Sequence, residues 1–143
     1  MIEPSENVID WADPTTEYFW NAARDHTLAI QQCTACKSYQ FYPRPFCLRC
    51  DSDAVEWVAA SGFGTVYSRT IIHLPPAPGL GLTAPYVVAI VELDEGPRLL
   101  TNLTNDSCVI GDRVHVEWRP RDGQAPVPIF GRVDVDAAAV GGQ

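Results

Sequence analysis

The chain has 143 residues, of which 46% are apolar, and it carries a net charge of −8 at pH 7 from eighteen acidic and ten basic residues. This length suits one modest domain, or one domain with a small metal-stapled appendage. The acidic balance argues against nucleic acid as a partner, because polyanions would meet no general attraction. No apolar run is long enough to span a bilayer, so we expect no membrane partner. The acidic start lacks the layout of a secretory signal, which predicts a cytoplasmic protein with reduced thiols.

Residues 1–28 are predicted to form an extended arm followed by a helix. Asp13 is the expected N-cap, Pro14 suits the first helical position, and Glu17 faces the positive end of the helix dipole. The helix would end near His26. It concentrates more aromatic surface than a small ribbon can bury, in Tyr18, Phe19 and Trp20. Two interpretations therefore stand: the helix packs on its own domain, or part of it docks on something larger.

Residues 29–55 contain two Cys-x-x-Cys pairs, Cys33 with Cys36 and Cys47 with Cys50, separated by ten residues. This spacing suits two knuckles that present four thiolates tetrahedrally to one metal ion, and we predict a structural zinc site. Such a site has no open coordination position, so it would not act as a catalytic Lewis acid. The alternatives are disulfides, a redox-active Cys-x-x-Cys, or iron, which spacing alone does not exclude. The intervening residues are expected to form two short strands and a turn, with sulfur-shielding rings from Tyr39, Phe41 and Phe46.

Three of the ten basic residues lie within this ribbon, at Lys37, Arg44 and Arg49. They have two interpretations. Either they offset the double negative charge of a zinc ion bound by four thiolates, or they provide a local binding site for a small anion. The sequence does not choose between these.

Residues 56–135 read as strands with no internal helix signal, and residues 136–143 as a frayed tail. The expected strands are 62–74, 86–94, 97–104, 112–118 and 126–133. A Pro/Gly-rich loop at 75–86 separates the first two, and Glu95-Gly96 makes a tight hairpin after the second.

Alternation assigns faces to two of these strands. In the first strand it separates Val66, Ser68, Thr70 and Ile72 from Tyr67, Arg69, Ile71 and His73. In the fourth it places on one face Val114, Val116 and Trp118. Five strands in one run point to a Greek-key barrel of the OB type, whose long first strand would be coiled and bulged near Gly62 to Gly64. A plain β-sandwich is the alternative.

The motifs resemble a known family when taken in order. The resemblance covers roughly residues 18–133. It depends on motifs that follow one another in the order FW…LAIQQC-x-x-C…F-x-P-R-P-x-C-x-x-C…EWV-x-x-SGFGTVYSRT…PYVVAIVELDEGPRLLTNL…IGDRVHVEW…PVPIF. The chain is similar to the acyl-CoA-associated zinc-ribbon and OB-fold proteins, the family of domain of unknown function 35. One departure is Lys37, where members often carry Gly after the first Cys-x-x-Cys.

The resemblance implies a mainly β protein with an N-terminal helix, a rubredoxin-like four-cysteine zinc ribbon and a C-terminal five-stranded OB-type barrel. It also implies a companion subunit of thiolase-superfamily enzymes, namely thiolases, acyltransferases, or retro-aldolases that shorten steroid or similar side chains. Such a subunit contacts the larger one and helps seat the coenzyme A thioester, while the carbon–carbon chemistry belongs to the partner.

On this reading two sets of contact residues are expected. The candidate groups for the phosphates of coenzyme A are Lys37, Arg44 and Arg49. The candidate contacts to the partner or to an apolar acyl channel are Tyr18, Phe19, Trp20, Leu80 and Leu82.

No catalytic grouping is apparent in the sequence. The three histidines, His26, His73 and His115, are scattered, and no nucleophile elbow or phosphate-binding glycine loop is present. Cys108 has no histidine near it in sequence and is expected to be a small packing residue. We therefore expect no activity from the chain alone.

Two other functions are weighed against the companion subunit. A single-stranded nucleic-acid-binding module could stack bases on Phe63, Tyr67 and Trp118. An autonomous enzyme would have to use His73, Asp94 or Glu95.

Overall fold

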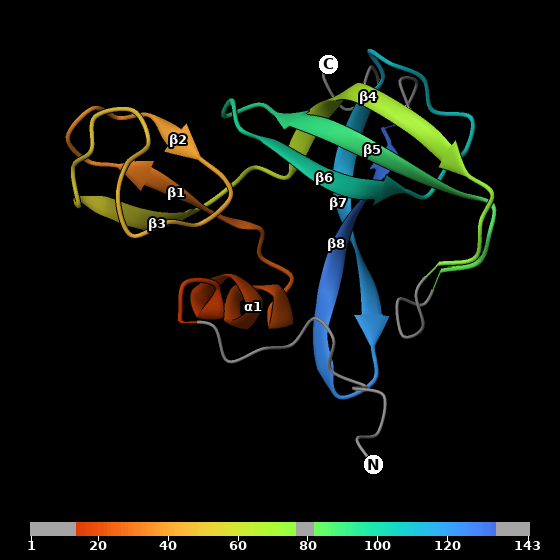
Figure 1. The fold of residues 1–143 in the computed structure, drawn as a ribbon, viewed down its shortest axis with the longest axis horizontal. Helices are drawn as coiled ribbons and strands as arrows, with labels where there is room; N and C mark the ends of the chain where they lie inside the picture. The colour runs from red at the N-terminus through yellow and green to blue at the C-terminus, as the bar shows by residue number, and fades with distance from the viewer. Residues whose placement is uncertain (1–13, 77–81, 134–143) are drawn as a thin grey trace, which may run out of the picture.

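The structure is a computed structural model that describes residues 14–76 and 82–133, so the predicted arm, Leu80 and the tail lie outside the described residues. In these residues one helix precedes eight strands (Figure 1). The elements are α1 (Glu17–Arg24), β1 (Ala29–Cys33), β2 (Tyr39–Gln40), β3 (Val55–Ala59), β4 (Phe63–Ile72), β5 (Tyr86–Leu93), β6 (Arg98–Leu103), β7 (Arg113–Arg121) and β8 (Gln124–Arg132).

The ribbon is a small three-stranded antiparallel sheet in the order β2-β1-β3. The central strand β1 pairs along its whole length with β3, from Ala29 opposite Ala59 to Cys33 opposite Val55. β2 contributes only two residues, because the chain after Gln40 leaves the sheet to form the second knuckle. In Figure 1 this sheet stands beside the barrel, joined to it by the connection from β3 to β4.

The remaining strands form a closed barrel in the order β4-β5-β6-β8-β7. The pairs are antiparallel except β6 with β8, and β4 closes the barrel against β7. This is the strand order of a five-stranded Greek-key barrel of the OB type, so that prediction is confirmed and the β-sandwich alternative is wrong.

The helix begins later than predicted. α1 starts at Glu17, Thr16 occupies the N-cap without a side-chain capping bond, and residues 14–16 form a turn. A start at Pro14 was therefore wrong, although Glu17 does lie in the first turn as expected. The helix ends at Arg24, and the left-handed backbone of His26 (φ 56°) directs the chain away towards β1.

The predicted faces of β4 were also wrong. The pairing register with β5 skips Tyr67, between Val66 and Ser68. After this bulge Ile71 packs against the same core as Val66, although strict alternation put them on opposite faces. One extra residue reverses the in-and-out phase of a strand, and nothing in the alternating sequence marks where it is inserted.

The last two strands run further than predicted. β7 continues to Arg121 and β8 begins at Gln124, so the residues between the two expected strands form part of a long hairpin, with Gly123 in left-handed backbone (φ 70°). Figure 1 shows this hairpin extending beyond the barrel, with α1 beside β8. The prediction that Val114, Val116 and Trp118 share one face of β7 is confirmed, because Val114 is fully buried and Val116 and Trp118 pack on the same core.

One hydrophobic core joins the ribbon side to the barrel. Phe19 of α1 and Ile30 of β1 belong to the same buried cluster as Val91 and Phe130 of the barrel. Cys108 is completely buried in this cluster, which confirms that it is a packing residue. The helix therefore packs on its own domain, and the ribbon and the barrel share apolar contacts.

Candidate metal centre and apolar cavities

The two knuckles have the same backbone design. The residue that follows each Cys-x-x-Cys pair is left-handed, with φ 67° at Lys37 and 64° at Asp51. The N–H of each donates to the carbonyl of the first cysteine of its pair, at 2.9 Å in both knuckles. The knuckle turn therefore tolerates a side chain at the position where related sequences often carry Gly, at a modest backbone cost.

The four sulfurs converge on one point. Cys33 Sγ lies 3.6 Å from Cys50 Sγ, and Cys36 Sγ lies 3.6 Å from Cys47 Sγ. All four ligand atoms lie within 4.8 Å of one another. Sulfurs at about 2.3 Å from a central zinc ion stand roughly 3.8 Å apart in a tetrahedron, whereas a disulfide needs about 2.05 Å. All five cysteines are free, so the disulfide alternative is wrong and the four residues form a four-cysteine zinc-ribbon site.

The electrostatics of the cluster call for a cation. The Ser38 hydroxyl, 3.0 Å from Cys36 Sγ and 3.5 Å from Cys47 Sγ, lowers the pKa of Cys36 and lowers the pKa of Cys47 to about 6. A backbone hydrogen bond with Ser52 acts to lower the pKa of Cys50, but burial and the three neighbouring thiols raise it to about 12. Thiols this close do not all ionise on their own, and a bound metal ion supplies the missing positive charge.

The predicted ribbon cations lie on the surface. The side chains of Lys37, Arg44 and Arg49 are exposed, and none of them belongs to the ion pairs found in the described part of the chain. The side chain of Gln31 fixes the backbone of Arg44: Gln31 Oε1 accepts the Arg44 N–H and Gln31 Nε2 donates to the Arg44 carbonyl, both at 2.9 Å.

The predicted aromatic shield is only partly in place. Phe41 packs against Phe19 of α1, with the ring centres 5.5 Å apart. Tyr39 and Phe46 are partly exposed.

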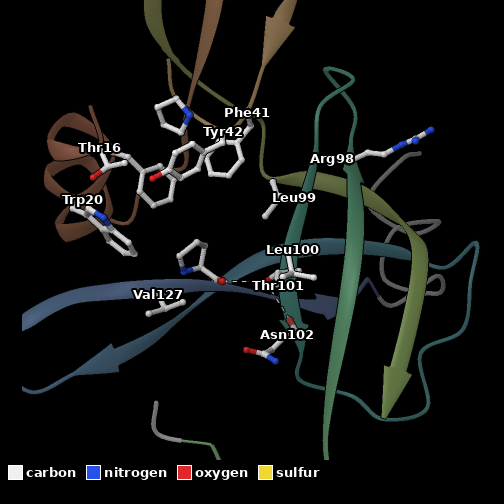
Figure 2. A pocket seen from close by; sticks show the side chains of 13 residues that line it. Thr16, Trp20, Phe41, Tyr42, Arg98, Leu99, Leu100, Thr101, Asn102 and Val127 are labelled. Atoms are coloured by element: carbon white, nitrogen blue, oxygen red, sulfur yellow. Dashed lines mark hydrogen bonds between the residues drawn. The ribbon is translucent and has the colours of Figure 1, made fainter. Parts of the chain in front are cut away.

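An apolar cavity of about 520 Å³ lies where the helix, the ribbon loop and the barrel meet (Figure 2). Its lining residues are Thr16, Phe19, Trp20, Phe41, Tyr42, Pro43, Arg98, Leu99, Leu100, Thr101, Asn102, Val127 and Pro128. Figure 2 shows Trp20 on one side and Leu99 and Leu100 on the other, with the Asn102 amide at the far end. Below it the hydroxyl of Thr101 donates to the carbonyl of Pro128 at 3.1 Å and links β6 to β8.

A second cavity of about 830 Å³ lies at the end of the barrel next to the β4–β5 connection. It is lined by Ile71, His73, Leu82, Pro85, Tyr86, Val87, Asn102, Leu103, Thr104, Asn105, Asp106, Arg119 and Ile129. Asn102 lines both cavities, so the two hollows share a wall.

The residues predicted to contact the partner or the acyl chain are divided between the two cavities and the exposed surface. Phe19 and Trp20 line the first cavity and Leu82 lines the second. Tyr18 lines neither; it is 53% exposed and stacks on Trp57, with ring centres 5.0 Å apart. Sequence reasoning missed Asn102 and Arg119. The only available signal was a single amide inside the apolar run LLTNL.

The residues named for the other functions have other roles in the fold. Trp118 stacks on His26, Phe63 packs on His115, and the Arg98 guanidinium lies 3.8 Å above the Tyr67 ring. Asp94 is paired with Arg113, and Glu95 accepts the N–H of Ser61 at 2.7 Å. No nucleophile–base grouping forms from them in the described part of the chain. Within those residues no helix has the length and apolar character needed to cross a membrane.

Two family models match the chain in tandem. The ChsH2 rubredoxin-like zinc ribbon domain matches residues 20–56 and the ChsH2 C-terminal OB-fold domain matches residues 57–119. The solved structure described as "Ltp2-ChsH2(DUF35) aldolase" contains a chain that is 38% identical, with a TM-score of 0.77 over 86% of this chain and 98% of that one.

Three curated relatives are also similar. The "Probable enoyl-CoA hydratase alpha subunit" of Thermomonospora curvata is 43% identical over 116 residues, which are 78% of this chain and 36% of that protein. The "3-oxo-4,17-pregnadiene-20-carboxyl-CoA hydratase alpha subunit" of Mycobacterium tuberculosis is 40% identical over 102 residues, which are 71% and 32%. The chain thus spans about a third of the length of these two. A "DUF35 domain-containing scaffold protein" of Methanothermobacter thermautotrophicus is 35% identical over 98 residues, which are 66% of this chain and 73% of that protein.

Fold and site together define a zinc-ribbon protein with an OB-type barrel. The chain belongs to the DUF35 family, with the ribbon and the barrel matching the two ChsH2 domain types in order.

Proposed function

We propose that this chain is a non-catalytic accessory subunit of an acyl-CoA enzyme: it binds a larger thiolase-superfamily subunit and helps position the acyl-CoA thioester. The observation that carries the proposal is the 38% identity to a chain of an Ltp2-ChsH2(DUF35) aldolase, over 98% of that chain. We further propose that the acyl group is steroid-like, because the Mycobacterium tuberculosis relative is named for a pregnadiene carboxyl-CoA substrate.

The shape of the site supports a binding role. A zinc site closed by four cysteines leaves no coordination position for a substrate. The first cavity has the size of a small-molecule pocket, and its walls come from the helix, the ribbon loop and the barrel. Zinc, by fixing the ribbon, would therefore fix one wall of this pocket. In this proposal the acyl or pantetheine portion of the thioester lies against Trp20, Leu99 and Leu100.

The finer contacts follow from exposure. Lys37, Arg44 and Arg49 are exposed and available to the phosphates of coenzyme A. Tyr18 is available to the partner, while Phe19 is 6% exposed and would act by supporting Trp20. The division of the chain into helix, ribbon, barrel and tail and its location in the cytoplasm are further parts of this proposal.

A hydratase partner is the second candidate. It is favoured by the two hydratase alpha subunits, in which the segment like this chain makes up about a third of the protein. In that case the chain would cooperate with a hydratase fold instead of a thiolase fold.

Co-expression tests the partner class directly. The chain is co-expressed with a thiolase-superfamily subunit or with a hydratase subunit from the same genome, and each pair is run on size-exclusion chromatography at micromolar concentration. We expect one joint peak with the thiolase-superfamily subunit and acyl-CoA turnover by the complex but not by the chain. A joint peak with the hydratase alone would favour the second candidate, and separate peaks in both cases would contradict the accessory role.

A further inference from the structure

Arg119 is a cation in the wall of the second cavity, and no carboxylate of the described residues pairs with it. It lies on β7, and its Nη1 donates to Asn102 Oδ1 in a long hydrogen bond of 3.3 Å. Its Nε is buried and has no hydrogen-bond partner among the residues that the structure describes. In the described part of the chain Arg98, Arg113 and Arg132 each pair with a carboxylate, and Arg119 does not.

The surroundings leave this charge uncompensated. Asp106 is the single carboxylate among the described residues that line the cavity, and it forms no ion pair with Arg119. Partial burial lowers the pKa of Arg119, and burial is the one cause of that shift. A half-buried guanidinium without an anion costs stability, and such groups persist where something else provides the charge.

The cavity provides room and further polar groups. Its volume of about 830 Å³ lies within the range of small-molecule sites. His73 and Asn105 stand on other parts of the wall, and Asn102 is fixed from the opposite side by its bond to the Val87 carbonyl at 2.8 Å. Strands β5 and β6 line it together with His73, Leu82 and Pro85 of the β4–β5 connection, and these correspond to the second and third strands and the first loop of an OB barrel, a region that binds ligands in this fold.

We infer that Arg119 is the binding group of an anion site in this cavity, which takes a phosphate or carboxylate group of a small ligand. Asn102 Oδ1 accepts from Nη1, so the edge formed by Nε and Nη2 is left to bind an oxyanion in a bidentate fork. This site is distinct from the exposed cations of the ribbon.

The test is a titration of the full, zinc-loaded chain with sodium pyrophosphate, and in parallel with sodium succinate. Binding is measured by calorimetry and by the NMR signal of the Arg119 Nε–H. We expect saturable binding of one probe with a shift of that signal, and a dissociation constant at least about tenfold weaker in Arg119→Gln. Arg119→Lys keeps the charge without the fork and should lie between the two. The probe that binds identifies the class of anion.

Arg24→Gln is the matched control, since Arg24 is an exposed arginine at the end of α1 that lines neither cavity. It should bind as the unchanged chain does. Thermal unfolding adds a second measurement: the probe should raise the melting temperature of the unchanged chain and not that of Arg119→Gln. Equal affinity in Arg119→Gln, or no binding of either probe at millimolar concentration, overturns the inference. Neither result depends on the partner subunit.

Discussion

Gln31 and Gln40 lie opposite each other in adjacent strands of the ribbon, and Gln40 Nε2 donates to Gln31 Oε1 at 2.9 Å. Both residues are buried. Gln31 binds the backbone of Arg44, while Gln40 accepts the N–H of Leu48 at 3.0 Å and donates to the carbonyl of Phe46 at 3.1 Å. Two side-chain amides thus hydrogen-bond the backbone of Arg44, Phe46 and Leu48, which belong to no strand of the sheet. They hold the loop that carries the second knuckle and one wall of the apolar cavity.

Gln31→Leu should therefore loosen the second knuckle. The change leaves the N–H and the carbonyl of Arg44 without their side-chain partner and removes one of the two bonds that Gln40 Nε2 donates, which should cost about 2 kcal/mol of unfolding free energy. We also expect faster zinc loss to a competing chelator. Gln32→Leu is the control, because Gln32 makes one exposed bond to the Lys37 carbonyl at 3.2 Å and should cost less than about 1 kcal/mol. Equal losses in the two variants would show that the amide network has no special role.

Metal removal should unfold the ribbon more than the barrel. We predict one zinc ion per chain by elemental analysis, and its loss with a strong chelator or in Cys47→Ser. The total tryptophan fluorescence should change, because Trp57 lies on β3, while most of the far-ultraviolet β signal stays, because the closed barrel has its own interior.

Cys108→Ala is the control for metal removal. It should keep the ion and cost about 1 kcal/mol as a small core truncation. The barrel should melt at a lower temperature without zinc, since Leu28 and Ile30 share its core. Complete loss of the β signal on chelation would contradict separate stability of the two parts.

Gly64 allows β4 to approach β5 closely. A Cβ at this position would lie 2.6 Å from the Glu92 carbonyl oxygen and 2.8 Å from Val91 Cγ1. Gly64→Ala should therefore lower the unfolding free energy by about 1 to 3 kcal/mol, measured by denaturant titration. Gly123→Asn is the control, because that turn has open space and Asn tolerates its left-handed backbone. A Gly64→Ala protein as stable as the unchanged chain would mean that the strands can separate at no cost.

Leu100 tests the apolar cavity as a binding site. It is 73% exposed yet lines that cavity, so Leu100→Glu should place a charge at the pocket without unfolding the protein. We expect about tenfold weaker binding of the neutral fluorescent probe N-phenyl-1-naphthylamine, and of a medium-chain acyl-CoA in the complex. Ile110→Glu, at a residue 65% exposed and away from both cavities, should leave the affinity unchanged. Equal weakening in both variants would indicate non-specific binding.

The Asp94–Arg113 pair predicts a small dependence of stability on acid. Hydrogen bonds from Arg113, at 2.6 and 3.0 Å, lower the pKa of Asp94. The stabilisation is therefore present above the unfolded carboxyl pKa of about 3.9 and is lost as the pH falls through the lower folded value. Both groups are nearly half exposed, so the effect should stay below about 1 kcal/mol. Asp94→Asn should be less stable than the unchanged chain at pH 6 and equal to it in strong acid, whereas Asp53→Asn should show no such difference.

The sequence by itself determined the elements whose chemistry is local. Four cysteines at Cys-x-x-Cys spacing predicted the metal site, because each knuckle is closed by bonds between residues four apart. Local patterns also predicted the shared face of Val114, Val116 and Trp118 and the hairpin at Glu95-Gly96. The order of the strands, together with the family motifs, predicted the barrel.

The tertiary structure alone decided what depends on residues far apart in the chain. The bulge at Tyr67, the shared core of Phe19 and Phe130, and the meeting of Trp20 with Leu100 arise from packing between distant segments, which no local pattern encodes. The same holds for Arg119. The sequence around it gives no sign of a binding site, and only the closure of the barrel places its guanidinium beside Asn102, with no carboxylate of the described residues paired to it.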